Sequence, residues 1–239
     1  SKAYLFAGVE IRWRCDPALL ANDDPVPAEA VLHYPGGLSD YLNDATADTA
    51  LLVSTPFADL VELDGQKFEW AITWLGAGED GFFHSYCNTV PTPSGGTHEA
   101  GFRQAITRAL RSFGDLAGNR KAAEITAEDV FAGTAVMLSV FLRDPQFQGQ
   151  TKDRLVSADT TRQTEQAARD RFEQWLAADA ARANFLLDAA IERAEERKRR
   201  KKEREIARKS ATRRLRLPGK LADCTASNTD LTELFLVEG

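Results

Sequence analysis

Alternating and continuous apolar runs predict a series of β-strands in the first part of the chain. The clearest alternation covers residues 67–74, where Lys67, Glu69, Ala71 and Thr73 interleave with four large apolar residues, as is typical of a β-strand. Residues 82–88 are expected to pair with that strand as a hairpin across the glycine-rich segment 76–81. The unbroken apolar run 135–142 predicts a fully buried strand. Further strands are expected at residues 1–14, where the alternation predicts a half-buried strand, and at residues 30–34, 51–54 and 59–63.

Apolar residues at helical spacing predict three main helices. Residues 97–113 place Phe102, Ile106 and Leu110 on one face, and Thr97 suits the N-cap. A second helix is expected at residues 161–177. A third runs from about 180 to 211 without Gly or Pro, roughly 45 Å at 1.5 Å per residue. Its first half carries an apolar stripe and its second half is charged all round, so only the first half can pack in a core. Shorter helices are expected at residues 38–43 and after Thr126. The predicted fold class is α+β, a mixed sheet with packed helices followed by a long basic helix.

The charge is unevenly distributed along the chain. Residues 197–216 contain twelve Lys or Arg against two Glu, a local charge of +10, so the rest carries −16 within a net charge of −6. Such asymmetry favours a polyanionic partner for the basic segment.

Composition limits the class of protein. Cys15, Cys87 and Cys224 are odd in number and widely spaced, which indicates a reducing compartment and argues against a disulfide framework. No apolar run approaches the length that spans a bilayer, so no membrane association is expected. Residues 1–14 enter a strand pattern at once, and residues 234–239 resemble a buried strand that stops as it reaches a loop. We therefore expect both ends to be cuts inside a longer protein.

The segment that best suits binding chemistry is Phe147-Gln148-Gly149-Gln150-Thr151-Lys152. It follows the buried strand, and Gly149 permits a tight bend. Gln150 and Lys152 lie two residues apart, which places both on one side of an extended chain. An amide and an ammonium at a strand end suit an anion, above all a phosphate. Taken alone, the hexapeptide fits a solvated lysine on a surface loop better than a binding site, and the motifs elsewhere in the chain are what favour the anion site.

A second candidate anion site is the Gly95–Gly96 pair before a helix. No GxxxxGK[ST] motif is present, so a tight turn into a packed helix is the favoured interpretation. His98 is expected to be a structural hydrogen-bonding residue.

Four motifs in this order resemble those of type IIA bacterial topoisomerase B subunits, and topoisomerase IV more than gyrase. They are Gly95-Gly96-Thr97-His98-Glu99-Ala100-Gly101-Phe102-Arg103, the segment Asp144–Lys152, Leu217-Pro218-Gly219-Lys220-Leu221-Ala222-Asp223-Cys224, and Thr232-Glu233-Leu234-Phe235-Leu236-Val237-Glu238-Gly239.

The resemblance implies a domain organisation. Residues 1–37 correspond to the C-terminal hairpin of the GHKL ATPase domain, and residues 38–178 to the transducer domain, which has the fold of the second domain of ribosomal protein S5. Residues 179–216 correspond to a long linker helix, and residues 217–239 to the start of the TOPRIM domain.

The resemblance also implies roles for particular residues. Gln150 and Lys152 would touch the γ-phosphate of ATP, with Lys152 acting in catalysis, and Glu238 would help to hold Mg²⁺. The implied cofactors are ATP and Mg²⁺, both needing regions outside this chain. DNA contacts are expected from basic residues of the long helix and beyond it, namely Arg199, Arg200, Lys201, Lys202, Arg213, Arg214 and Lys220.

The implied activity is that of an ATP-hydrolysing DNA topoisomerase, with this chain alone inactive. The partners would be DNA, the topoisomerase IV A subunit and a second B subunit in an A2B2 assembly, in the bacterial cytoplasm at the nucleoid. Three alternatives remain open: a nucleic-acid-binding structural protein with a basic helical arm, a gyrase B subunit that acts in supercoiling, and the middle domain of another GHKL protein.

Overall fold

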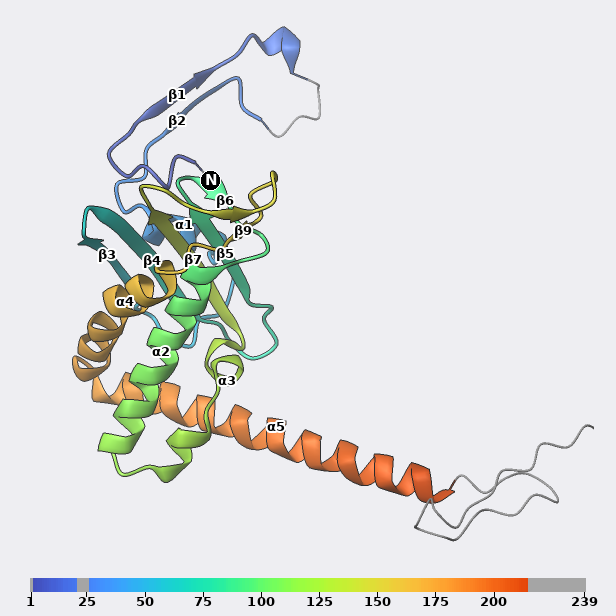
Figure 1. Ribbon diagram of the computed structural model, residues 1–239. Coiled ribbons are helices and arrows are strands. Elements are labelled where there is room, and N and C mark those ends of the chain that lie inside the picture. Colours follow the sequence, from blue (N-terminus) through green and yellow to red (C-terminus); the bar gives the residue numbers. More distant parts are fainter. Residues whose placement is uncertain (1, 21–25, 215–239) are drawn as a thin grey trace, which may run out of the picture. The chain divides into compact units, whose positions relative to one another are not determined.

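The computed structural model describes residues 2–20 and 26–214, with side chains as far as residue 207 except that of residue 17, and Figure 1 shows its elements. The chain forms two compact units, Ser1–Ala194 and Glu195–Gly239. The predicted mixed α+β architecture ending in a long helix is confirmed.

A five-stranded sheet forms the centre of the first unit. Its strand order is β3 (Phe57–Leu63), β4 (Gln66–Trp74), β7 (Thr134–Phe141), β5 (Phe82–Cys87) and β6 (Val90–Pro91). β4 runs antiparallel to β3 and β7, whereas β5 runs parallel to β7. The sheet is therefore mixed, as expected.

The predicted hairpin between residues 67–74 and 82–88 is wrong, because β7 lies between these strands. Val136 of β7 pairs with Ile72 on one side and with Phe83 on the other. β7 is buried along nearly all of its length and so takes the central position, with a neighbour on each edge. A parallel pair needs a crossover connection, which the chain makes between β5 and β7 through α2 (Thr97–Leu116) and α3 (Ala127–Phe131).

Helices cover both faces of the sheet. α2 and α4 (Thr160–Ala177) lie side by side on one face, and α1 (Leu38–Ala45) packs on the other against β4 and β7 (Figure 1). Both faces of β4 are covered, since Ala71 and Thr73 are 0% and 1% exposed. Leu38 and Leu42 of α1 pack in one cluster with Ala71 on the second face.

Aromatic side chains fill the layer between the sheet and its helices. Phe172 of α4 lies 5.0 Å from Phe57 and 5.5 Å from Trp175, measured between ring centroids. Arg182 places its guanidinium 3.7 Å from the Trp175 ring centroid. This cluster fixes α4 and the start of α5 (Ala180–Arg214) to the sheet.

The amino-terminal strands form a separate two-stranded ribbon of β1 (Ile11–Arg14) and β2 (Glu29–Leu32). A short 3₁₀ helix, η1 (Pro17–Leu19), follows β1. The prediction of a half-buried strand over residues 1–14 is wrong, since β1 has four residues and all are exposed. A lone ribbon has no second layer against which to bury one face. The strand expected at residues 51–54 is likewise reduced to a single bridge between Leu51 and Leu75.

The predicted long helix is confirmed as α5, which extends to Arg214. Within the first unit its apolar stripe is buried throughout, with residues Ala183, Leu186, Leu187, Ala190, Ile191 and Ala194. From Glu195 the helix belongs to the second unit, and residues 198–207 are exposed. Among the described helices, none is both long and apolar enough to cross a membrane.

Candidate functional site

The segment around Gly149 folds into a small hairpin. β8 (Phe147–Gln148) pairs antiparallel with β9 (Arg154–Leu155), and residues 149–153 form the loop between them. Gly149 has φ +76° and Lys152 has φ +59°. The predicted extended geometry for Gln150 and Lys152 is wrong, because the chain reverses direction at these residues.

The loop presents its polar side chains to solvent. Gln150, Thr151 and Lys152 are all exposed. The Lys152 ammonium lies 5.8 Å from the Phe147 ring centroid, and no carboxylate in the described part of the chain pairs with it. A lysine with left-handed φ costs about 1–2 kcal/mol, so surrounding contacts must hold the loop in this conformation.

Those contacts come from the turn that precedes α2. The Ser94 amide donates to the Asp153 carbonyl at 3.0 Å, and the Leu155 amide donates to the Gly95 carbonyl at 3.1 Å. Gly96 forms a parallel bridge with Leu155, whose side chain is fully buried. The residues just after Lys152 are therefore hydrogen-bonded to the start of α2. Sequence reasoning missed these anchors, although the paired glycines were a signal that another backbone approaches closely.

The Gly95–Gly96 segment is a tight turn into a packed helix, as favoured from the sequence. Gly96 is the N-cap of α2 and Thr97 is its first residue, so the predicted capping role of Thr97 is wrong. His98 is fully buried, and its Nε2 lies 3.1 Å from Thr92 Oγ1. Burial lowers the pKa of His98 to about 4. The prediction that His98 is a structural hydrogen-bonding residue is confirmed.

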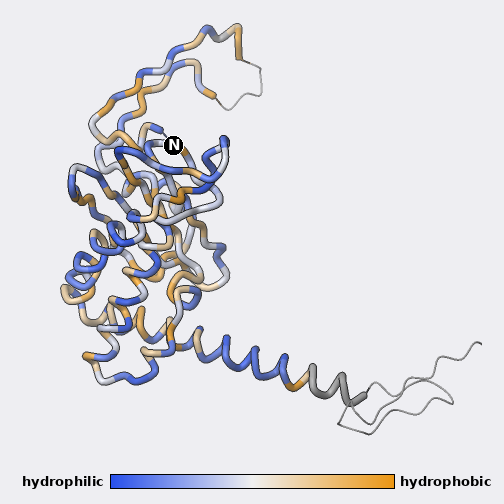
Figure 2. The backbone as a smooth tube through the Cα atoms, in the orientation of Figure 1, coloured by the Kyte–Doolittle hydropathy of each residue, from blue (hydrophilic) through white to orange (hydrophobic). Residues whose placement is uncertain are grey.

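The second candidate site is the later part of α5, and the coloured portion of this part is an almost continuous hydrophilic run in Figure 2. Arg200 donates to Glu196 at 2.5 Å, and Arg199 lies within 3.9 Å of both Glu196 and Glu203. Lys201 and Lys202 are exposed, and no described carboxylate pairs with either. Local ion pairs thus neutralise part of the arginine charge and leave the two lysines available.

Four predicted site residues lie wholly or partly outside the described part of the chain. Arg213 and Arg214 lie in α5, but their side chains are outside the described part of the chain, and Lys220 and Glu238 lie outside the described residues altogether. Among the described residues, no cluster of three or more His, Cys, Asp or Glu could hold a metal ion.

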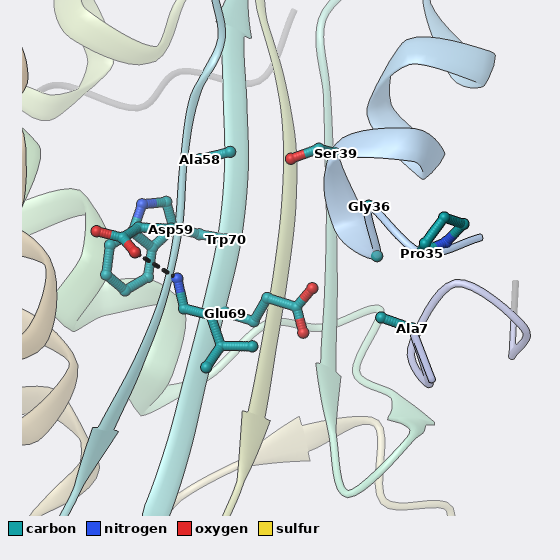
Figure 3. A pocket seen from close by; sticks show the side chains of 10 residues that line it. Ala7, Pro35, Gly36, Ser39, Ala58, Asp59, Glu69 and Trp70 are labelled. Carbon is teal, nitrogen blue, oxygen red and sulfur yellow. Dashed lines mark hydrogen bonds between the residues drawn. The ribbon is translucent and has the colours of Figure 1, made fainter. Parts of the chain in front are cut away.

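Glu69 of β4 is a buried carboxylate. It lines a pocket of about 270 Å³ and reaches toward Gly36 and the start of α1, as Figure 3 shows. Its Oε1 accepts from the Leu38 amide at 3.0 Å, and Lys67 lies 3.9 Å from Oε2. The carboxylate therefore satisfies a buried amide in the first turn of α1, which is a structural role. A lone glutamate amid apolar neighbours was the available signal.

Comparison with known proteins identifies the family to which this chain is related. The model of the family described as DNA gyrase B matches residues 37–206. The B subunit of DNA topoisomerase 4 from Caulobacter vibrioides is 50% identical over 100% of this chain and 35% of its own length. That of Bartonella bacilliformis is also 50% identical, over 100% of this chain and 34% of its own length. The chain thus spans about a third of the length of the curated relatives it matches.

A solved structure shows the same fold. The 43K ATPase domain of Thermus thermophilus gyrase B superposes with a TM-score of 0.69 and 26% identity, covering 85% of this chain and 53% of that one. The sequence match and the shared fold agree with the motifs at Gly95–Arg103 and Asp144–Lys152. This chain belongs to the DNA gyrase B family, the B subunits of type IIA topoisomerases.

Proposed function

We propose that this chain is the coupling segment of a topoisomerase IV B subunit, linking ATP binding and hydrolysis to DNA strand passage, decatenation and relaxation. In this assignment residues 1–37 end the GHKL ATPase domain and residues 38–178 form the transducer. Residues 179–216 form the linker helix, and residues 217–239 begin the TOPRIM domain. Identity of 50% to subunits named topoisomerase 4 over the whole chain supports this over gyrase.

The observation that carries the proposal is the exposed Lys152 on a hairpin tied to a core helix. Its ammonium has no carboxylate partner among the described residues, and the neighbouring Gln150 amide is also exposed. Together they offer the donors that suit one terminal phosphate of ATP, so these residues fit that part of the nucleotide. The remaining contacts to ATP must come from residues outside this pair.

The hairpin then works as a sensor. Lys152 holds the terminal phosphate while it is present and loses its ionic partner once that phosphate has been cleaved and released. Because β9 is hydrogen-bonded to the turn before α2, movement of the loop is transmitted to α2 and the sheet that it covers. Binding energy at one loop thereby changes the position of a whole domain.

The other partners follow from the same assignment. DNA would lie along the exposed basic face of α5, contacted at its phosphates by residues that include Lys201 and Lys202. Glu238 would contribute to a Mg²⁺ site that serves DNA cleavage. The A subunit and a second B subunit would complete an A2B2 enzyme in the bacterial cytoplasm, associated with the nucleoid. Alone, the chain would hydrolyse no ATP.

The test replaces Lys152 with Ala or Met in the full-length subunit. ATP turnover should fall by about 10²–10³, the scale for one preorganised transition-state contact, with a smaller effect on nucleotide binding. Lys121→Ala is the matched control, since Lys121 is an exposed lysine in η2 (Arg120–Glu124), beyond the opposite end of α2. Unchanged turnover in Lys152→Ala would refute the sensor assignment.

The second candidate function is that of a nucleic-acid-binding structural protein, which the basic part of α5 favours. The discriminating measurement is ATP-dependent decatenation by the full-length subunit with its A partner. Activity that requires ATP supports the coupling role, whereas DNA binding without any such activity supports the structural role.

A further inference from the structure

Three buried polar side chains form a connected chain beneath the Lys152 hairpin. His98 Nε2 lies 3.1 Å from Thr92 Oγ1, which lies 2.7 Å from Ser85 Oγ. Ser85 Oγ in turn donates to the Thr92 carbonyl at 3.1 Å. These side chains are 0%, 1% and 5% exposed, in the order His98, Thr92, Ser85. Three polar groups this deeply buried have to satisfy one another.

Two arrangements of the hydrogens satisfy these contacts. In one, Ser85 donates to the Thr92 carbonyl, Thr92 donates to Ser85 Oγ, and His98 Nε2–H donates to Thr92 Oγ1. In the other, Ser85 donates to Thr92 Oγ1, and Thr92 donates to an unprotonated His98 Nε2. In both, Nε2 bonds the Thr92 hydroxyl, and Nδ1 has no partner within the described residues. The low pKa of His98 keeps the ring neutral, so Nε2 can take either role.

The same threonine holds the turn that anchors the Lys152 loop. The Gly95 amide donates to the Thr92 carbonyl at 2.8 Å, and the Gly95 carbonyl accepts from the Leu155 amide. His98 is thus connected to β9 by hydrogen bonds through Thr92 and Gly95. Lys152 lies three residues before Leu155, within the loop that these bonds hold.

We propose that His98 is a positioning residue for the Gln150–Lys152 loop, acting through the Thr92 hydroxyl on the turn to which β9 is hydrogen-bonded. The consequence for ATP turnover rests on the proposed function of Lys152. The anchoring itself depends only on the observed bonds.

Two substitutions in the full-length subunit separate positioning from simple stability. His98→Leu fills a similar volume but removes the Nε2 atom that bonds the Thr92 hydroxyl, whereas His98→Gln can place an amide N–H or amide oxygen near the same point. We expect His98→Leu to lower kcat for ATP by about tenfold with a smaller change in KM, because a catalytic group displaced by a fraction of an ångström loses rate. His98→Gln should restore most of the loss. Thr92→Val removes the hydroxyl with little change in shape and carries the same test if His98→Leu does not fold.

Amide hydrogen exchange measures directly how firmly the loop is anchored. Exchange at the Ser94 and Leu155 amides should rise in His98→Leu and return toward the wild-type rate in His98→Gln. The Leu38 amide, held by Glu69 on the opposite face of the sheet, is the internal control and should not change.

The outcomes are distinguishable. Unchanged exchange at Ser94 and Leu155 overturns the proposal, as does normal turnover in His98→Leu when Lys152→Ala is impaired. Raised exchange with lowered kcat supports it. Raised exchange with normal turnover in both His98→Leu and Lys152→Ala upholds the anchoring and refutes the sensor function of Lys152 instead.

Discussion

Gly96 is the position where one added methyl group tests the anchoring of the Lys152 hairpin. A Cβ at Gly96 would lie 2.3 Å from the Leu155 carbonyl oxygen and 2.7 Å from its amide nitrogen. Non-bonded heavy atoms sit at about 3.5 Å, so Gly96→Ala must push β9 away by about 1 Å. That movement breaks the 3.1 Å bond from the Leu155 amide to the Gly95 carbonyl.

The loss of folding stability expected from Gly96→Ala has two contributions. The backbone at Gly96 has φ +147°, a conformation that costs a non-glycine residue about 1–3 kcal/mol. The broken hydrogen bond adds about 0.5–1.5 kcal/mol. We therefore expect Gly96→Ala to lower the free energy of unfolding by about 2–4 kcal/mol, measured by urea denaturation.

Two other glycines provide matched controls. Gly118 has φ +72° with no atom within 4 Å of an added Cβ, so Gly118→Ala should cost only the left-handed strain, about 1–2 kcal/mol. Gly8 has neither a left-handed φ nor a close neighbour, and Gly8→Ala should be close to neutral. In the full-length subunit, ATP turnover should fall in Gly96→Ala but not in Gly118→Ala. If Gly96→Ala costs no more than Gly118→Ala, the close approach of the turn to β9 does not exist in solution.

Two further predictions concern charge. Replacing Lys201 and Lys202 with Gln should reduce the slope of the logarithm of the DNA-binding constant against the logarithm of the salt concentration by up to about 2. The decrease is near 0.9 for each phosphate that a lysine no longer neutralises, and fluorescence anisotropy on a short duplex measures it. The double variant Arg199→Gln with Arg200→Gln should reduce this slope less, because Glu196 already pairs with both arginines. Equal slopes in wild type and both variants would show that these charges serve only the helix. Burial lowers the pKa of His98 from 6.5 to about 4, so the unfolded chain binds a proton at a pH where the folded chain does not. Titration of His98 thus leaves the free energy of unfolding unchanged above pH 6.5. It lowers the free energy of unfolding as the pH falls from 6.5 toward 4, by about 2–3 kcal/mol at pH 4.5. His98→Gln has no such titrating group, so the difference in free energy of unfolding between wild type and His98→Gln should shrink by about 2–3 kcal/mol from pH 7 to pH 4.5. A difference that stays constant over this pH range would contradict the effect of burial on His98.

Local spacing alone determined the helices of this protein. The apolar stripes of α2, α4 and the first half of α5 follow from side chains three and four residues apart, which share a helix face whatever lies opposite. The change from apolar to basic residues along α5 is likewise evident in the linear sequence. The exposed Gln150-Thr151-Lys152 segment could also be singled out, because a glycine next to polar residues after a buried strand indicates a loop.

Only the tertiary structure decided which strands are neighbours and which faces are covered. Strand pairing joins residues far apart in the chain, so the placement of β7 between β4 and β5 left no trace in the hairpin-like pattern of residues 67–88. The burial of Glu69 depended on α1 covering the second face of the sheet. In the same way, the bonds from Ser94 and Gly95 to the chain after Lys152 join segments about sixty residues apart through backbone groups, and backbone bonds carry no signature in the identity of side chains.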